Sequence, residues 1–197
     1  MHLSDGILDG SVCLAGYAAS AALIAYSARK IDNEDVPKIS VVTAAFFVAS
    51  LIHIKLGPSS MHLVLNGLVG ILLGAAAVPS IFIGLLLQAV VFGHGGITTL
   101  GVNTIIMGTP ALLSWFIFRI GRKRQKSTLL FFSFVAGAAA IAGAALLTAL
   151  FLMTAGKEFF AIARIVLLAN IPIMLIEATI TLFVVSFLLK VKPQLLD

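Results

Sequence analysis

Charged residues are scarce in this sequence of 197 amino acids. They make up only 11% of the chain, against 60% for apolar residues, and the mean hydropathy is +1.14. Side chains of this kind leave too little polar surface to cover a water-soluble globule. The composition therefore excludes a soluble enzyme and predicts an integral membrane protein.

Cysteine is scarce as well, and nucleotide-binding motifs are lacking. The single cysteine, Cys13, lies in an apolar run, which excludes an intrachain disulfide and a cysteine metal cluster. Because no G-x-x-x-x-G-K-[ST] motif occurs, we expect that the chain does not bind ATP itself. The net charge of +5 comes from basic residues in short loops beside apolar spans, where they determine topology and indicate no nucleic-acid partner.

Long apolar stretches predict the fold class. They are close to the twenty or so residues that a spanning helix needs and lack the alternation of barrel strands. We therefore expect an all-α membrane protein, a bundle of about seven transmembrane helices, in which residues 1–197 form a single transmembrane domain. Pro172 is expected to kink the last helix. The predicted spans are 10–28, 39–54, 61–76, 79–93, 103–119, 128–155 and 160–189.

Basic residues distinguish the two sides of this bundle. Of the thirteen, only Lys55, Lys157 and Arg164 fall on the side that includes the N-terminus. The positive-inside rule then predicts an extracytoplasmic N-terminus and a cytoplasmic C-terminus. The ten basic residues on the other side are Arg29, Lys30, Lys38, Arg119, Arg122, Lys123, Arg124, Lys126, Lys190 and Lys192.

The first two residues form a chelating group. A chain that begins Met1-His2 offers the terminal amine, the amide nitrogen of residue 2 and its imidazole, which close two fused rings around a metal ion. This nearly planar set suits Ni(II) and Cu(II) and leaves one position for a second imidazole. The predicted topology places the other histidines, His53, His62 and His94, on the same outer side. A histidine at a membrane interface is also commonly a capping or packing residue.

His62 is the best candidate for the fourth ligand. The sequence predicts that it starts the third helix, with Asn66 one turn below it, where the amide could orient the ligand. Alternatively, His62 caps the helix and Asn66 bonds a neighbouring helix. Asn103, at the start of the fifth span, is expected to point into the bundle and to orient a ligand as well. His94 lies in a Gly-rich loop, and we interpret it as a loop residue with an accessory role at most.

Three segments of the sequence resemble the NikM/CbiM family, the substrate-capture membrane subunits of energy-coupling-factor importers for nickel and cobalt. They are the start MHLSDG, the segment SSMHLVLNG at 59–67 and the run LQAVVFGHGGITTLGVNT at 87–104. The resemblance covers almost the whole chain. It implies a prokaryotic cytoplasmic membrane and an N-terminal segment inserted into the bundle.

The resemblance also implies the ligands and the partners. The metal ligands become Met1, His2 and His62, and the only bound species expected is the substrate, Ni(II) or Co(II), with no other cofactor. The stretch from His62 to Gly67 looks like the nickel branch, whereas His94 departs from the family pattern. The partners would be a membrane-embedded coupling subunit, cytoplasmic ATPase subunits and a small accessory membrane subunit.

Two further features bear on helix contacts. Small residues recur along one face of the first span and of the sixth, and either face could dock on another membrane helix or pack inside the chain. Glu177 is the only carboxylate deep in an apolar run, and we expect a neutral, hydrogen-bonded group that holds helices together. The small residues are Ala15, Ala18, Ala19, Ala22 and Ala25, and Ala136, Gly137, Ala140, Gly143 and Ala144.

Two other functions fit parts of the sequence. An intramembrane serine protease would use Ser59 with His62, but these residues are only three positions apart, whereas a nucleophile and its base normally come from separate helices. A proton-coupled secondary transporter would use Glu177, but seven spans do not divide into two inverted repeats. Metal capture is therefore the favoured hypothesis, and the protein is not expected to be an enzyme.

Overall fold

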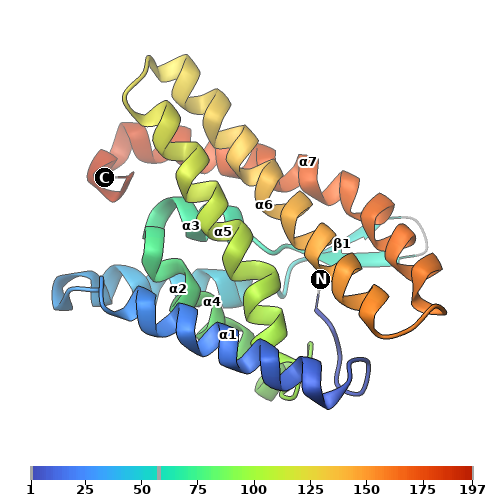
Figure 1. Cartoon of the computed structure of the whole chain (residues 1–197). Coiled ribbons are helices and arrows are strands. Elements are labelled where there is room, and N and C mark those ends of the chain that lie inside the picture. Colours follow the sequence, from blue (N-terminus) through green and yellow to red (C-terminus); the bar gives the residue numbers. More distant parts are fainter. Residues whose placement is uncertain (1, 57–58, 197) are drawn as a thin grey trace.

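The computed structural model describes residues 2–56 and 59–196 and is predominantly helical (Figure 1). A short β-hairpin interrupts the helices between α2 and α3, and three short 3-10 helices complete the described elements. The elements are α1 (Gly10–Ala28), η1 (Asn33–Asp35), α2 (Val36–Ala49), β1 (His53–Leu56), β2 (Ser59–His62), α3 (Asn66–Leu73), η2 (Gly74–Ala76), α4 (Ala77–Phe92), α5 (Leu100–Arg122), α6 (Lys126–Thr154), α7 (Phe159–Val191) and η3 (Pro193–Leu196).

Five helical segments of the described chain are long and apolar enough to cross a membrane. The prediction of a multi-pass, all-α membrane protein is thus confirmed. The expected number of about seven transmembrane helices fits roughly, since the described residues form seven α-helices but only five such segments. Two of them are short, since α2 has 14 residues and α3 only 8. The five segments are Gly10–Ala28, Asn66–Phe92, Leu100–Arg122, Lys126–Thr154 and Phe159–Val191.

The β-hairpin corrects the predicted second and third spans. Helix α2 ends at Ala49 rather than at residue 54, and α3 begins at Asn66 rather than at residue 61. Between them β1 and β2 pair antiparallel, with His53 opposite His62. The physical reason is local, because a Gly-Pro pair and two serines within a short polar stretch favour a turn over a continuous helix.

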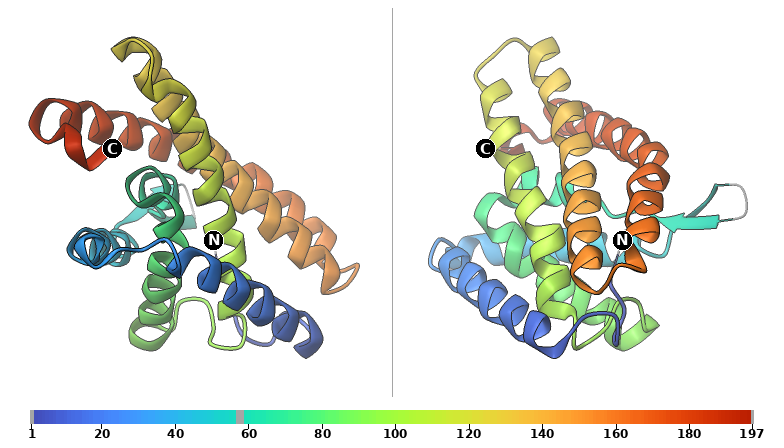
Figure 2. Two further views of the ribbon diagram at one scale, coloured as in Figure 1. Left: turned by 60° about the vertical axis from the view of Figure 1, so that its left-hand side comes forward. Right: turned by 45° about the vertical axis from the view of Figure 1, so that its right-hand side comes forward.

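Helix α5 lies at the centre of the bundle. It packs against α1, α3, α4 and α6, while α7 packs along α6 (Figure 1 and Figure 2). Close approach depends on glycine, since a Cβ atom at Gly70 of α3 would lie 2.0 Å from the carbonyl oxygen of Ala111 in α5. Such contacts are typical of membrane helices, which associate through small residues.

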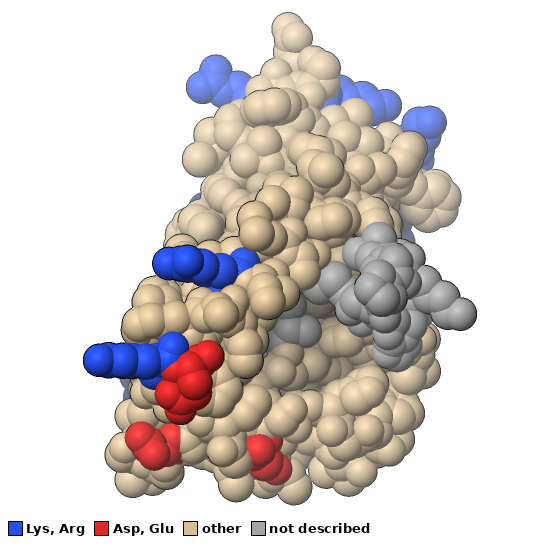
Figure 3. Space-filling view, turned by 90° about the vertical axis from the view of Figure 1, so that its right-hand side faces the viewer, with Lys and Arg blue, Asp and Glu red and all other residues tan. Residues whose placement is uncertain are grey.

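Charge is distributed unevenly over the molecule. On the face shown in Figure 3, Lys and Arg side chains gather at the upper end and others lie at the left further down, while the Asp and Glu side chains in view all lie near the lower end. The upper end includes the turn between α5 and α6, with Arg122, Lys123 and Arg124. The gathering of basic residues at the upper end agrees with the uneven distribution that the sequence predicts.

Candidate metal site

The N-terminal segment before α1 lies against the bundle and is held there through its main chain. Asn103 of α5 accepts a hydrogen bond from the Leu3 N–H at 2.9 Å and donates one to the Leu3 carbonyl at 3.0 Å. The Thr99 hydroxyl donates to the same carbonyl at 2.7 Å. Asn103 is 2% exposed, so this residue points into the bundle as the sequence predicts. These bonds fix the position of the residue next to His2.

A second contact lies three residues further along, at Asp5. Its carboxylate accepts hydrogen bonds from the N–H groups of Ile97 and Thr98, at 3.2 and 2.9 Å, and from the Thr98 hydroxyl. The hydroxyl bond in particular lowers the pKa of Asp5. At Gly96 a Cβ atom would lie 2.0 Å from an oxygen of Asp5, so the loop between α4 and α5 needs glycine here. The loop and the N-terminal segment thus fit each other closely.

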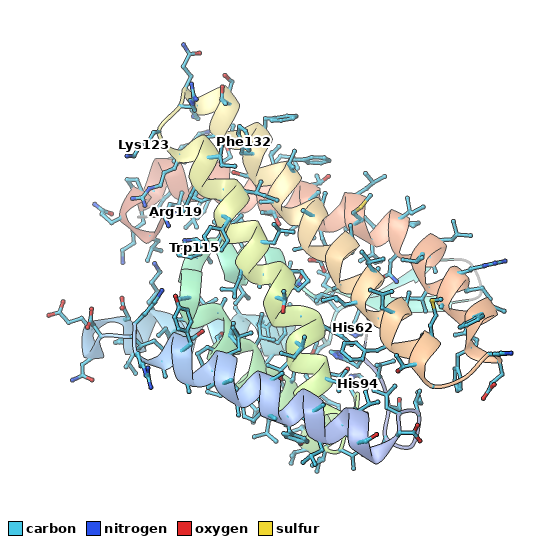
Figure 4. All side chains as sticks on the ribbon, viewed as in Figure 1. His62, His94, Trp115, Arg119, Lys123 and Phe132 are labelled. Atoms are coloured by element: carbon cyan, nitrogen blue, oxygen red, sulfur yellow. The ribbon has the colours of Figure 1, made fainter. Side chains whose placement is uncertain are left out.

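Three histidine rings form a stack beside this segment. The rings of His2 and His62 lie 5.0 Å apart with 9° between their planes, and those of His62 and His94 lie 6.1 Å apart, again with 9°. Figure 4 shows His62 and His94 next to each other. Three separate elements supply them, namely the N-terminal segment, the end of β2 and the loop after α4.

The ring nitrogens of His2 are the unusual feature of this stack. The residue as a whole is half-buried, but both ring nitrogens are shielded from solvent and have no hydrogen-bond partner among the described residues. Burial lowers the pKa of His2 well below its ordinary value, and the neighbouring His62 and His94 lower it further. The ring is therefore neutral at physiological pH, which is the form that binds a metal ion.

His62 lies on a strand, which corrects the prediction that it starts a helix. Its Nδ1 lies 2.9 Å from the carbonyl oxygen of Leu63, an arrangement in which Nδ1 donates and Nε2 carries the lone pair. Asn66 therefore does not lie one turn below it on a common helix. Its amide donates instead to the carbonyl of Met107 in α5 at 3.2 Å. This is the bond to a neighbouring helix that the alternative interpretation of Asn66 predicts.

Side chains alone do not form a metal cluster here. Among residues 2–56 and 59–196, no three His, Cys, Asp or Glu side chains lie at metal-ligand spacing. A metal ion bound beside His2 therefore needs main-chain donors as well. The predicted ligand Met1 lies outside the described residues.

Comparison with known proteins identifies the family. Residues 2–195 match the family described as "Cobalt uptake substrate-specific transmembrane region". The chain belongs to the CbiM family. It is a transmembrane component for nickel or cobalt uptake, and its substrate is a transition-metal ion.

Relatives of this CbiM-family chain carry names from the same field. It is 36% identical over 200 residues to a Haemophilus influenzae protein provisionally named a metal transport protein, covering 100% of this chain and 97% of the relative. It is 30% identical to the cobalt transport protein CbiM of Geobacter sulfurreducens, covering 100% of this chain and 61% of the relative. A crystal structure of a transition metal transporter superposes with a TM-score of 0.82 at 27% identity, over 97% of this chain and 93% of the other.

Glu177 of α7 holds the segment that follows His62 in this CbiM-family chain. Its carboxylate accepts hydrogen bonds from the N–H groups of Val64 and, at 2.7 Å, Leu65. Leu65 has a positive φ of 54°, a conformation that costs energy in residues other than glycine. Glu177 is 1% exposed. The sequence indicated a hydrogen-bonding carboxyl group between helices, and the structure identifies the partner as the main chain between β2 and α3.

Replacing Glu177 by leucine should weaken metal binding. The variant leaves two buried N–H groups without acceptors, each at a cost of about 1–3 kcal/mol, and frees the segment that positions His62. We expect nickel affinity to fall by about 10–100-fold, and thermal stability to fall with it. Glu177→Gln keeps one acceptor and should lie between. The exposed Glu158→Gln serves as the control, and Glu177→Leu with wild-type affinity would contradict this role.

Proposed function

We propose that the protein captures Ni(II) from the extracytoplasmic side as the substrate-binding subunit of an energy-coupling-factor importer. Co(II) is the second candidate, because relatives of the chain are named for both metals. The observation that carries the proposal is His2, whose neutral ring has two buried nitrogens without protein partners and stacks on His62. Neutral, desolvated imidazole is a ligand poised for a transition metal.

Four nitrogens would hold the metal in a nearly square-planar arrangement. They are the amine of Met1, taken as the first residue of the mature chain, the amide nitrogen and imidazole of His2, and the imidazole of His62. A deprotonated amide suits Ni(II) and Cu(II), and of these two metals the names of the relatives point to Ni(II). His94 contacts the ring of His62 and would help to orient it, while Asn103 would position the chelating segment through Leu3.

The partners follow from what the chain itself lacks. It has no phosphate-binding loop, so transport would be driven by cytoplasmic ATPase subunits through a membrane-embedded coupling subunit, with a small accessory membrane subunit. The small-residue face of α1 is exposed, whereas that of α6 packs internally against α5 and α7. The exposed face suits a docking helix. The exposed residues are Ala15, Ala18, Ala19, Ala22 and Ala25.

Metal analysis of the purified protein tests this function. Protein purified in detergent from cells grown with nickel and cobalt should contain stoichiometric metal, with nickel in excess over cobalt. The His2→Ala variant, purified in parallel, should contain none and still insert in the membrane. Wild-type protein without either metal, or equal metal contents in both proteins, would reject the proposed site.

Affinity for nickel should rise with pH. Binding displaces one proton from the terminal amine and one from the amide, so affinity should change by about 100-fold per pH unit below the amine pKa of roughly 8. Because burial keeps His2 neutral, its imidazole should not steepen this slope until the pH is well below about 6.5. Calorimetry in two buffers of different ionisation enthalpy counts the protons released. An affinity that is independent of pH would contradict a nitrogen-only site.

A further inference from the structure

A cavity of about 340 Å³ adjoins His2, between the N-terminal segment and helices α6 and α7. Its walls are mostly aliphatic, and the polar side chains that line it are His2, Thr148 and Asn170. One water molecule needs about 30 Å³, so the cavity is large enough to admit solvent beside the ring. The question is which of these polar groups would bind it.

Asn170 has an acceptor that the protein does not use. The residue is 4% exposed, and its Nδ2 donates to the carbonyl of Val166 in the same helix at 2.7 Å. Its Oδ1 is buried and has no hydrogen-bond partner among the described residues. Thr148 differs, because its hydroxyl already donates to the carbonyl of Ala144 at 2.8 Å. A buried amide oxygen without a partner is costly, and in native structures it commonly marks a ligand or water site.

His2 supplies the matching donor. A residue-2 imidazole that closes the proposed chelate binds the metal through Nδ1, since this nitrogen gives the six-membered ring with the amide nitrogen. Its Nε2 then carries the proton and needs an acceptor. Metal-bound histidines almost always donate this second N–H to a carboxylate, a carbonyl or a water molecule, and the bond raises the basicity of the ligating nitrogen. Asn170, whose Oδ1 accepts no hydrogen bond among the described residues, lines the same cavity.

We propose that Asn170 positions His2 for metal binding: when the His2 ring turns to bind the metal, Asn170 Oδ1 accepts the hydrogen bond of its Nε2–H through a water molecule in this cavity. The inference rests on the proposed function. It makes Asn170 a positioning residue on α7, the same helix that holds the main chain after His62 through Glu177. The imidazoles of His2 and His62 would then both be oriented from one helix. No feature of the sequence around Asn170 predicts this, because an asparagine in an apolar span is commonly an interhelical hydrogen-bonding group.

The test compares Asn170→Leu with a matched control, Thr148→Val, which replaces the neighbouring polar side chain of the same cavity, whose hydroxyl already has a hydrogen-bond partner in Ala144. In Asn170→Leu we expect nickel affinity, measured by competition with a chelator, to fall by about 10–100-fold. In Thr148→Val it should stay within about 3-fold of wild type, well below that range. Asn170→Asp keeps the acceptor and should restore binding. Should Asn170→Leu fail to fold, Asn170→Ala is judged by the same criteria.

A spectroscopic readout separates positioning from packing. Square-planar Ni(II) is diamagnetic, so the Nε2–H of nitrogen-15-labelled His2 should give an exchange-protected NMR signal in the nickel-bound wild type and in Asn170→Asp. The signal should be lost in Asn170→Leu. Wild-type affinity and signal in Asn170→Leu, or equal losses in Thr148→Val, would overturn the inference. If both Asn170→Leu and His2→Ala bind nickel like the wild type, the proposed function fails together with this inference. If Asn170→Leu binds like the wild type but His2→Ala loses its nickel, only the role of Asn170 is rejected.

Discussion

Nickel capture should be abolished when an uncleaved tag precedes Met1. The tag converts the terminal amine into an amide, which is a poor ligand, and adds chain where the segment docks beside α5. Neither effect touches a membrane span, so the bundle should insert and fold normally, because its stability rests on helix packing. Metal content and thermal stability of the purified protein, measured together, check both expectations.

A tag after Asp197 provides the control, since it lies at the other end of the chain from His2 and should leave nickel content unchanged. Inserting one alanine between Met1 and His2 gives a subtler change. The imidazole moves to position 3, and the peptide then offers four nitrogens of its own, so binding should no longer depend on His62. Unchanged stoichiometry and affinity with the N-terminal tag in place would show that the terminal amine is no ligand.

His62→Ala should abolish tight nickel binding, whereas His94→Ala should weaken it by only about 10-fold. The stack explains the difference, because the ring of His62 lies 5.0 Å from that of His2, whereas the ring of His94 stacks on His62 at 6.1 Å. Loss of His62 removes the fourth nitrogen, but loss of His94 removes a neighbour that orients it. Equilibrium dialysis with nickel measures both variants. Equal losses would place His94 among the ligands.

The long helices could be predicted from the sequence, and the hairpin could not. Apolar runs such as the one from Lys126 to Thr154 are long enough to define a span by hydropathy alone. The segment around Lys55 is different, because short apolar stretches on either side of it make the predicted spans extend into residues that form strands. The Gly-Pro pair at 57–58 indicates a turn, but between two apolar runs such a pair is equally typical of a loop between helices.

The sequence singles out His2 and His62 as candidate ligands, but it does not indicate the contacts that hold the N-terminal segment in place. His2 and His62 stood out because their residue types and topology pointed to one side of the membrane. Asp5 gave no comparable signal, since its partner Thr98 lies 93 residues away and no periodicity connects them. Likewise, the position of Asn170 near His2 depends on which helices pack against the N-terminal segment. Contacts of this kind arise from tertiary packing alone.

The hydrogen bonds that Asn103 and Thr99 form with the Leu3 main chain have a consequence for metal affinity. A free peptide with the sequence Met-His-Leu-Ser-Asp carries the same three nitrogens as the protein, but it is disordered and must lose conformational freedom whenever it wraps a metal ion. In the folded protein, Asn103 and Thr99 impose that order before the metal binds. They bond the N–H and the carbonyl of Leu3, so the side chain at this position takes no part in these bonds. With the proposed ligands, the protein would be a preorganised chelator built from a flexible one. The side chain at position 3 would then matter for its fit to the core, while the number of residues between Leu3 and Asp5 is set by their contacts with Asn103 and Thr98.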